Sequence, residues 1–127
     1  MRLETRVIER GTVRVSLGGG RGDTVAFSGV VREADVSAWL LPLIEHVHRA
    51  ANTNRLPQIV LDIRQLEYAN AALWKCLVLW LKTLRDDSST TYTLRIVSDP
   101  RRLWQQIGIP KLRVFGGDHL HIDEAAA

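Results

Sequence analysis

The chain of 127 residues has very little cysteine, and Cys76 is its only one. A single cysteine excludes a disulfide within the chain and a zinc site built from several cysteines. It is also typical of proteins that work in a reducing compartment, so we expect a cytoplasmic location.

Long apolar runs are also missing. The longest, from Cys76 to Leu81, is far shorter than the roughly 20 residues with which a helix crosses a bilayer. The N-terminal residues are charged and lack the apolar core of a signal peptide. From these absences we expect neither membrane insertion nor export.

Charge of one sign is not concentrated anywhere. The net charge is +3 and the pI is near 9.5, but the basic residues are scattered without a run of five. This pattern argues against nucleic-acid binding. A nucleic-acid binder using Arg101, Arg102, Lys111 and Arg113 is a minor alternative that would show a strong salt dependence. The composition, 46% apolar and 24% charged, is ordinary for one globular domain spanning residues 1–127.

Alternating apolar residues predict strands at 3–9 and 12–17, joined in a hairpin at Gly11, and a third strand at 24–31 after the glycine-rich loop 18–23. A helix should follow, with Asp35 as N-cap and a bend or restart at Pro42. Its apolar face recurs at helical spacing and comprises Val36, Trp39, Leu40, Leu43, Ile44 and Val47.

The middle of the chain predicts a buried strand followed by a long helix. Residues 58–63 are almost entirely apolar, which is typical of a strand buried on both faces in the middle of a sheet. From Ala71 to about Arg85 the apolar arc is wider than a surface helix needs, with Cys76 at its edge and Leu79 among the polar positions. We infer that this helix is either sandwiched between other elements or contacts a partner.

The C-terminal part predicts a strand at 92–97 and a short helix with Asp99 as N-cap, Pro100 in first position and Gly108 at its end. The apolar residues of that helix, Leu103, Trp104 and Ile107, are expected to face inward. Short strands are expected at 113–115 and 120–122, before a tail at 123–127.

This order of elements resembles the STAS domains, the sulfate-transporter and anti-sigma-factor-antagonist family, over about Val13 to Ile122. The resemblance is carried by the strand–loop–helix segment 58–74 and by Ser98-Asp99-Pro100 with a later Ile107-Gly108-Ile109. It implies an α/β sandwich, with a mixed sheet of four to six strands and helices packed mainly on one face.

The loop before the long helix departs from the family pattern. Regulatory STAS domains carry Asp-Ser-Ser/Thr-Gly there, and a partner kinase phosphorylates one of the hydroxyls. This chain has Asn70-Ala71-Ala72-Leu73 instead, two residues after Tyr68. The resemblance therefore implies a degenerate phosphoacceptor loop, and an apolar surface that permanently resembles the unphosphorylated, partner-binding form.

The function that this resemblance implies is that of a non-enzymatic regulatory or scaffolding module without a cofactor. Its partner would be a kinase-type anti-sigma factor or another STAS-like protein, and homo-oligomerisation is a further expectation. Any of the four tryptophans that proves exposed would be an interface anchor. We expect the interface on loop 66–72 and the exposed side of the long helix, and we assign to it Leu66, Ala71, Lys75, Cys76, Leu79 and Lys82.

A histidine cluster near the C-terminus supports the main alternative. On a strand, His119 and His121 would share a face and could bind a metal or small ligand together with Asp118 or Asp123. No nucleophile or cofactor motif accompanies them, so the simpler interpretation is that these histidines are solvated surface residues.

Overall fold

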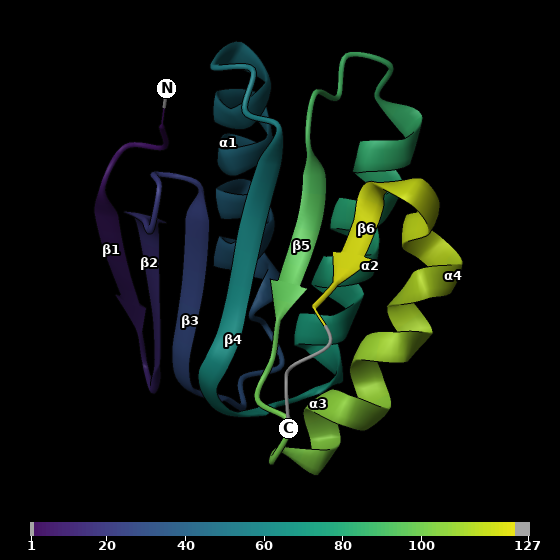
Figure 1. Ribbon diagram of the computed structural model, residues 1–127. Helices are drawn as coiled ribbons and strands as arrows, with labels where there is room; N and C mark the ends of the chain where they lie inside the picture. Colours follow the sequence, from purple (N-terminus) through teal and green to yellow (C-terminus); the bar gives the residue numbers. More distant parts are fainter. Residues whose placement is uncertain (1, 124–127) are drawn as a thin grey trace.

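A computed structural model describes residues 2–123. Within this range the strands form one mixed sheet in the order β1-β2-β3-β4-β5-β6 (Figure 1). The first two pairings are antiparallel and the other three are parallel. The strands are β1 (Arg6–Arg10), β2 (Val13–Gly19), β3 (Thr24–Val31), β4 (Gln58–Ala69), β5 (Thr93–Val97) and β6 (Leu120–Ile122).

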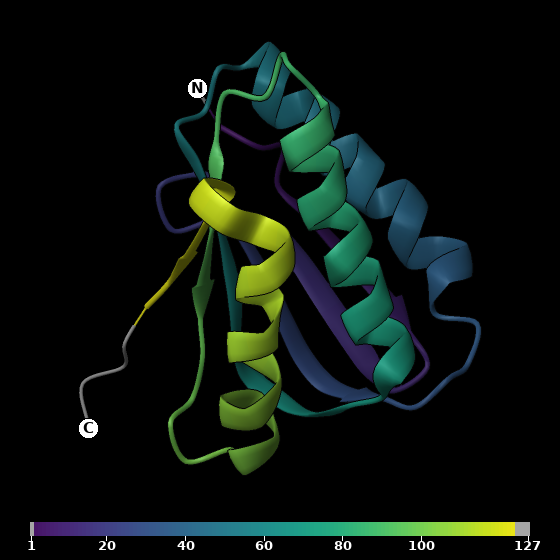
Figure 2. The ribbon, with the colours of Figure 1, turned by 90° about the vertical axis from the view of Figure 1, so that its right-hand side faces the viewer.

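The helices all lie on one side of this sheet (Figure 2). Two are long, α1 (Ser37–Thr53) and α2 (Ala71–Asp86). A nearly continuous helical run follows β5 and comprises α3 (Leu103–Gly108), η1 (Ile109–Leu112), α4 (Arg113–Gly116) and η2 (Gly117–His119). The predicted α/β sandwich, with a mixed sheet and helices mainly on one face, is confirmed. Among the described helices, none combines the length and apolarity of a membrane span.

The core lies between the sheet and the helices. Successive residues of a strand point to opposite faces, and in β4 the residues Ile59, Leu61 and Ile63 are buried whereas Val60 and Asp62 are only half-buried. The prediction that 58–63 is buried on both faces is therefore wrong, because helices cover only one face. Its central place in the sheet is confirmed. The strand also continues six residues further than predicted, to Ala69.

The N-terminal half agrees with the sequence except at the start of α1. The hairpin forms at Gly11, whose φ of 57° is the positive value that the first residue of a tight two-residue turn requires. The Asp35 side chain does not cap α1. Asp35 lies in a turn that precedes the helix, and its backbone oxygen accepts a hydrogen bond from the Ala38 nitrogen. Pro42 lies inside the helix, which is continuous past it.

The C-terminal third holds the larger corrections. The short helix begins at Leu103, because the Asp99 carboxylate accepts a hydrogen bond from the Arg101 nitrogen (3.0 Å) and so caps a turn instead of the helix. Residues 113–115 are helical and not a strand. The predicted strand at 120–122 is confirmed as β6. Residues 124–127 of the predicted tail lie outside the described range.

Candidate functional site

The start of α2 is held by Asn70. Its side-chain oxygen accepts a hydrogen bond from the Leu73 nitrogen (3.3 Å), and its side-chain nitrogen donates to the Glu33 backbone oxygen (3.0 Å). An N-cap of this kind satisfies a backbone donor that the helix itself leaves free. Asn70 therefore ties the helix start to the chain that leads into α1.

The other residues of the degenerate phosphoacceptor loop differ in exposure. Tyr68 and Ala71 are exposed, Ala72 is half-buried and Leu73 is buried in the core. Tyr68 lies within β4 and not in a loop, since the strand runs to Ala69. The first turn of α2 therefore presents a methyl group to solvent where the family resemblance expects a hydroxyl.

An apolar groove lies between α2 and the run from α3 to α4, which share one layer on the sheet (Figure 2). Its volume is about 850 Å³. Two of its apolar side chains reach solvent, with Leu79 46% and Ile107 54% exposed. The groove is lined by Ala71, Trp74, Lys75, Val78, Leu79, Trp104, Ile107, Gly108, Lys111, Leu112 and Phe115.

Aromatic packing fixes the end of the groove nearest the start of α2. The rings of Trp74 and Trp104 meet edge to face with centroids 5.9 Å apart, a preferred arrangement of aromatic pairs. The Trp104 indole nitrogen also donates to the Glu67 backbone oxygen at 2.9 Å. A Cβ on Gly108 would lie 2.6 Å from Trp74 Cζ2, so the helix can approach the indole this closely only with glycine.

The charges around the groove are positive. Lys75 and Lys111 line it, and Lys82 Nζ lies 5.9 Å from the centroid of the Phe115 ring. No carboxylate is among the groove's lining side chains. A partner surface that is apolar in its centre and acidic at its margins would match this arrangement.

Part of the predicted interface lies at this groove. Ala71, Lys75 and Leu79 line it, and Lys82 lies beside it. Leu66 and Cys76 do not belong to a surface, because both are buried, and the prediction is wrong for them. Burial also raises the pKa of the Cys76 thiol, which keeps that thiol protonated.

The sequence did not reveal the second wall of the groove. Leu103 is 72% exposed and Ile107 also reaches solvent, so their predicted inward orientation is wrong. The buried residue of α3 is Gln105, whose side-chain nitrogen donates to the backbone oxygens of Ile63 (2.8 Å) and Leu66 (3.1 Å). The four tryptophans were the available signal, since two of them line the groove.

A buried polar network lies at the other end of α2. Trp80 Nε1 donates to the Tyr92 hydroxyl oxygen (2.9 Å), and that oxygen lies 2.7 Å from His48 Nδ1. The other ring nitrogen of His48 lies 2.7 Å from the Asp87 carboxylate. Hydrogen bonds from Ser89 and His48 lower the pKa of Asp87 to about 2, and burial raises the pKa of Tyr92. The network joins α1 and α2 to Tyr92, the residue directly before β5, and the sequence did not predict it.

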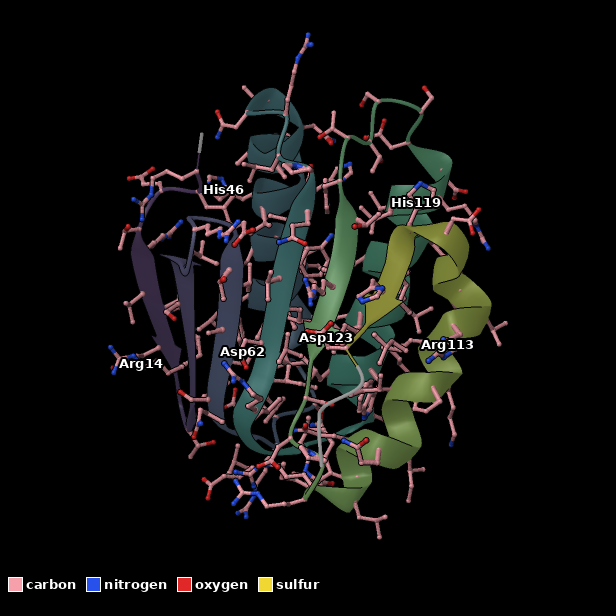
Figure 3. The ribbon with its side chains drawn as sticks, viewed as in Figure 1. Arg14, His46, Asp62, Arg113, His119 and Asp123 are labelled. Carbon is pink, nitrogen blue, oxygen red and sulfur yellow. The ribbon has the colours of Figure 1, made fainter. Side chains whose placement is uncertain are left out.

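The open face of the sheet carries ion pairs (Figure 3). Arg64 contacts both carboxylate oxygens of Asp62, at 3.0 and 2.8 Å. Burial opposes the ionisation of Asp62, but the hydrogen bonds from Arg64 outweigh it and hold the pKa of Asp62 below its ordinary value. Arg95 pairs with Asp123 at 2.8 Å. Asp62 and Asp123 thus each form an ion pair with an arginine.

The alternative site is not assembled as the sequence suggested. Asp118 and His119 lie in η2 and only His121 lies in β6. Figure 3 places His119 and Asp123 at opposite ends of β6. His121 lies 3.4 Å from Asp123, which Arg95 already contacts. Within residues 2–123, no three His, Cys, Asp or Glu side chains come together as metal ligands would.

Comparison with known proteins identifies the fold. Models of protein families and curated protein sequences give no match. Among solved structures, the chain is similar to an anti-sigma factor antagonist from Mycobacterium paratuberculosis, with a TM-score of 0.50 and 18% identity, over 93% of this chain and 84% of that one. The chain has the STAS fold. At this identity the likeness concerns the arrangement of strands and helices, and the expectation drawn from the resemblance is confirmed at that level.

Proposed function

We propose that this chain is a non-enzymatic regulatory or scaffolding module that binds a protein partner in the groove between α2 and the α3–α4 run. The observation that carries the proposal is the exposure of Leu79 and Ile107 in an apolar groove of about 850 Å³, because contiguous exposed apolar surface marks interaction sites. Its fold likeness to an anti-sigma factor antagonist supports a regulatory role.

The partner that fits this proposal is a kinase-type anti-sigma factor or another STAS-like protein, met in the cytoplasm. A second copy of the chain is the alternative occupant. The Trp74–Trp104 pair at one end of the groove supplies the kind of anchor that dominates binding energy. Lys75, Lys82 and Lys111 around it favour an acidic rim on the partner.

Binding at this surface is not gated by phosphate in our proposal. Ala71 and Ala72 occupy the first turn of α2, and neither side chain can accept a phosphoryl group. Ala71 also lines the groove, so a phosphate there would add about two negative charges beside an apolar contact. The alanines keep the surface permanently able to bind.

Site-specific cross-linking tests the proposal. A photoreactive amino acid is placed at Leu79 in one variant and at Val114 in another, and both are expressed in cells of the source organism. Val114 is 79% exposed and does not line the groove, so it is the matched control. We expect one protein to be cross-linked from position 79 and not from 114. Equal products from both positions, or none from 79, would contradict the proposal.

The absence of gating is tested by adding a charge at the first turn of α2. Asp at position 71 suits a helix N-terminus, so Ala71→Asp should fold normally and bind the cross-linked partner at least tenfold more weakly. Ala71→Ser, which restores a hydroxyl without charge, should bind within about twofold of the original chain. An Ala71→Asp variant with full affinity would show that the partner does not contact this turn.

A further inference from the structure

Strand β1 is an edge strand whose outer side is open. It pairs only with β2, and no described residue lies along its other side (Figure 1). The Arg10–Val13 pair closes the hairpin turn and is a hydrogen-bonded pair. From there, hydrogen-bonded and non-hydrogen-bonded pairs alternate along the two strands, so Val7 and Glu9 belong to non-hydrogen-bonded pairs. The backbone N–H and C=O groups of Val7 and Glu9 therefore point outward, free to pair with another strand.

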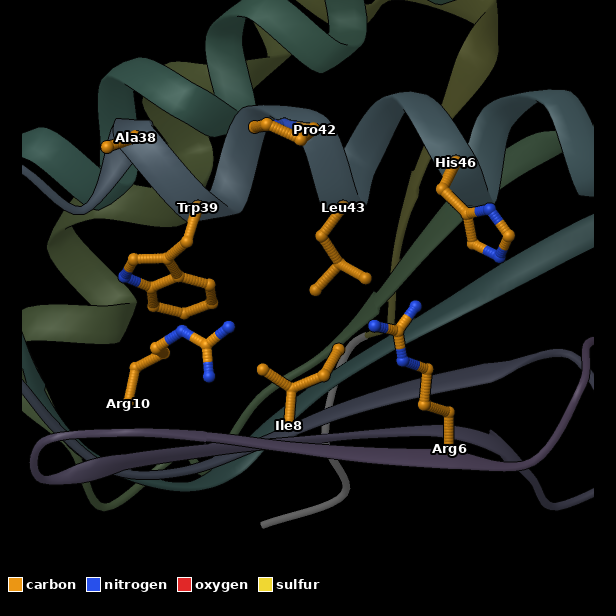
Figure 4. A pocket seen from close by; sticks show the side chains of 8 residues that line it. All are labelled: Arg6, Ile8, Arg10, Ala38, Trp39, Pro42, Leu43 and His46. Atoms are coloured by element: carbon orange, nitrogen blue, oxygen red, sulfur yellow. The ribbon is translucent and has the colours of Figure 1, made fainter.

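The side of β1 that faces α1 carries charged as well as apolar side chains. Arg6, Ile8 and Arg10 alternate onto this side, and only Ile8 is buried. Figure 4 shows these three side chains opposite Trp39 and other residues of α1. A cavity of about 380 Å³ lies between them, lined by Arg6, Ile8, Arg10, Ala38, Trp39, Pro42, Leu43 and His46.

The arginines that line this cavity have no carboxylate beside them in its lining, although Glu33 lines a neighbouring pocket together with Arg10. The cavity's own lining includes two guanidinium groups and an imidazole but no carboxylate. Within the described part of the chain, neither Arg6 nor Arg10 forms an ion pair, and the Arg10 guanidinium donates to the Glu9 backbone oxygen (3.0 Å). A guanidinium has five N–H donors, so both arginines keep donors for an external acid.

We propose that β1 accepts an added strand from an acidic protein partner, whose inward-facing side chains are acidic, apolar and acidic at positions i, i+2 and i+4. The two arginines are four residues apart along the strand, about 13 Å, and acids at i and i+4 of a paired strand have the same spacing. The apolar residue between them lies against Ile8 and Leu43. The outward N–H and C=O groups of Val7 and Glu9 supply the backbone hydrogen bonds.

The same arginines argue against a second copy of this chain as the added strand. Antiparallel pairing of two β1 strands about Ile8 sets Arg6 opposite Arg10, and parallel pairing sets each arginine beside its own copy. Like charges directly opposite each other destabilise a strand pair. The occupant is therefore a different, acidic chain, and this edge is separate from the groove beside α2.

The test uses two synthetic peptides with blocked ends and the same composition. In Thr-Glu-Thr-Val-Thr-Glu-Thr both acids share one face with the valine. In Thr-Glu-Thr-Val-Glu-Thr-Thr the acids lie on opposite faces. Titrated into the ¹⁵N-labelled protein, the first peptide should bind at least tenfold more tightly and should slow hydrogen exchange at the amides of Val7 and Glu9. Equal affinities of the two peptides, or binding without slower exchange at these amides, would mean that the peptides bind by charge attraction alone. Either result would overturn the proposal.

Three variants separate the contributions. Arg6→Gln with Arg10→Gln should lower the affinity at least tenfold, whereas Arg14→Gln, on the opposite face of the hairpin, should leave it unchanged. Val7→Pro removes an outward N–H while keeping both arginines, and it should abolish the protection with the fold intact by its ¹⁵N spectrum. If neither peptide binds at millimolar concentration, the arginines serve only to guard the edge against pairing, and the proposal is wrong.

Discussion

At the scale of single residues, hydrogen bonds between buried polar side chains fix how neighbouring elements contact one another more closely than apolar packing alone would. The Tyr92 hydroxyl accepts from Trp80 and meets His48 Nδ1. Because a carboxylate only accepts, His48 Nε2 donates to Asp87, while His48 Nδ1 lies 2.7 Å from the Tyr92 hydroxyl oxygen. One hydroxyl thus fixes the contact between two helices and the strand that begins at Thr93.

Replacing Tyr92 with phenylalanine should cost about 1–3 kcal/mol of unfolding free energy, because the Trp80 N–H and the His48 nitrogen lose their buried partner. Urea unfolding followed by tryptophan fluorescence measures the change. The control is Tyr68→Phe, which removes the hydroxyl of an exposed tyrosine and should change stability by under about 0.5 kcal/mol. Equal effects of the two variants would contradict the role of the network.

Two carboxylates should make the protein sensitive to acid. Hydrogen bonds from Ser89 and His48 lower the pKa of Asp87 to about 2, and those from the Arg101 side chain and backbone do the same for Asp99. Both values lie below the ordinary 3.8, so the unfolded chain binds more protons between about pH 4 and 2. The free energy of unfolding should therefore be highest above pH 4 and fall as the pH drops toward 2.

Urea unfolding at a series of pH values checks this slope. The double variant Asp87→Asn, Asp99→Asn should be less stable at neutral pH, because the charge-assisted hydrogen bonds are lost, and its stability should fall less steeply between pH 4 and 2. A slope identical to that of the original chain would mean that other groups control the acid response.

At the scale of elements, apolar periodicity predicted most of the fold. The spacing of Leu73, Leu77 and Trp80 placed α2 almost to the residue, because these side chains are buried against the sheet. The same reasoning was wrong for α3. There the buried position is Gln105, which supplies hydrogen bonds to carbonyl groups of β4, while Leu103 and Ile107 stay in solvent. Single-element periodicity cannot reveal a polar residue buried to serve a neighbouring strand.

Gln105→Ala should loosen the anchoring of the α3–α4 run on β4. The Ile63 and Leu66 oxygens and the Asp99 nitrogen each lose a hydrogen bond to this side chain, at a cost of about 1–3 kcal/mol. Hydrogen exchange at residues 103–116 should accelerate along with the loss of stability. The neighbouring variant Gln106→Ala, at an exposed position, should show a clearly smaller loss. Similar losses in both would contradict the anchoring role.

At the scale of the whole molecule, the helices lie on one face of the sheet (Figure 2), and two surfaces remain open to a partner. These are the groove beside α2 and the edge of the sheet at β1. The sequence indicated the α2 side of the groove through Ala71, Lys75 and Leu79. It could not indicate the opposite wall, because that wall depends on how the α3–α4 run packs across from α2. Nor could it separate the buried Leu66 and Cys76 from surface residues.

The measurement that tests the central claim most directly is a binding affinity. The partner identified by cross-linking is purified, and its affinity is measured for the original chain and for two variants. Leu79→Asp places a charge in the groove, whereas Val114→Asp places the same charge on an exposed apolar residue outside it. We predict that Leu79→Asp weakens binding at least tenfold, about 1.4 kcal/mol, with unchanged thermal stability, and that Val114→Asp binds like the original chain. Full affinity of Leu79→Asp, or equal losses in both variants, would contradict the groove as the partner-binding site.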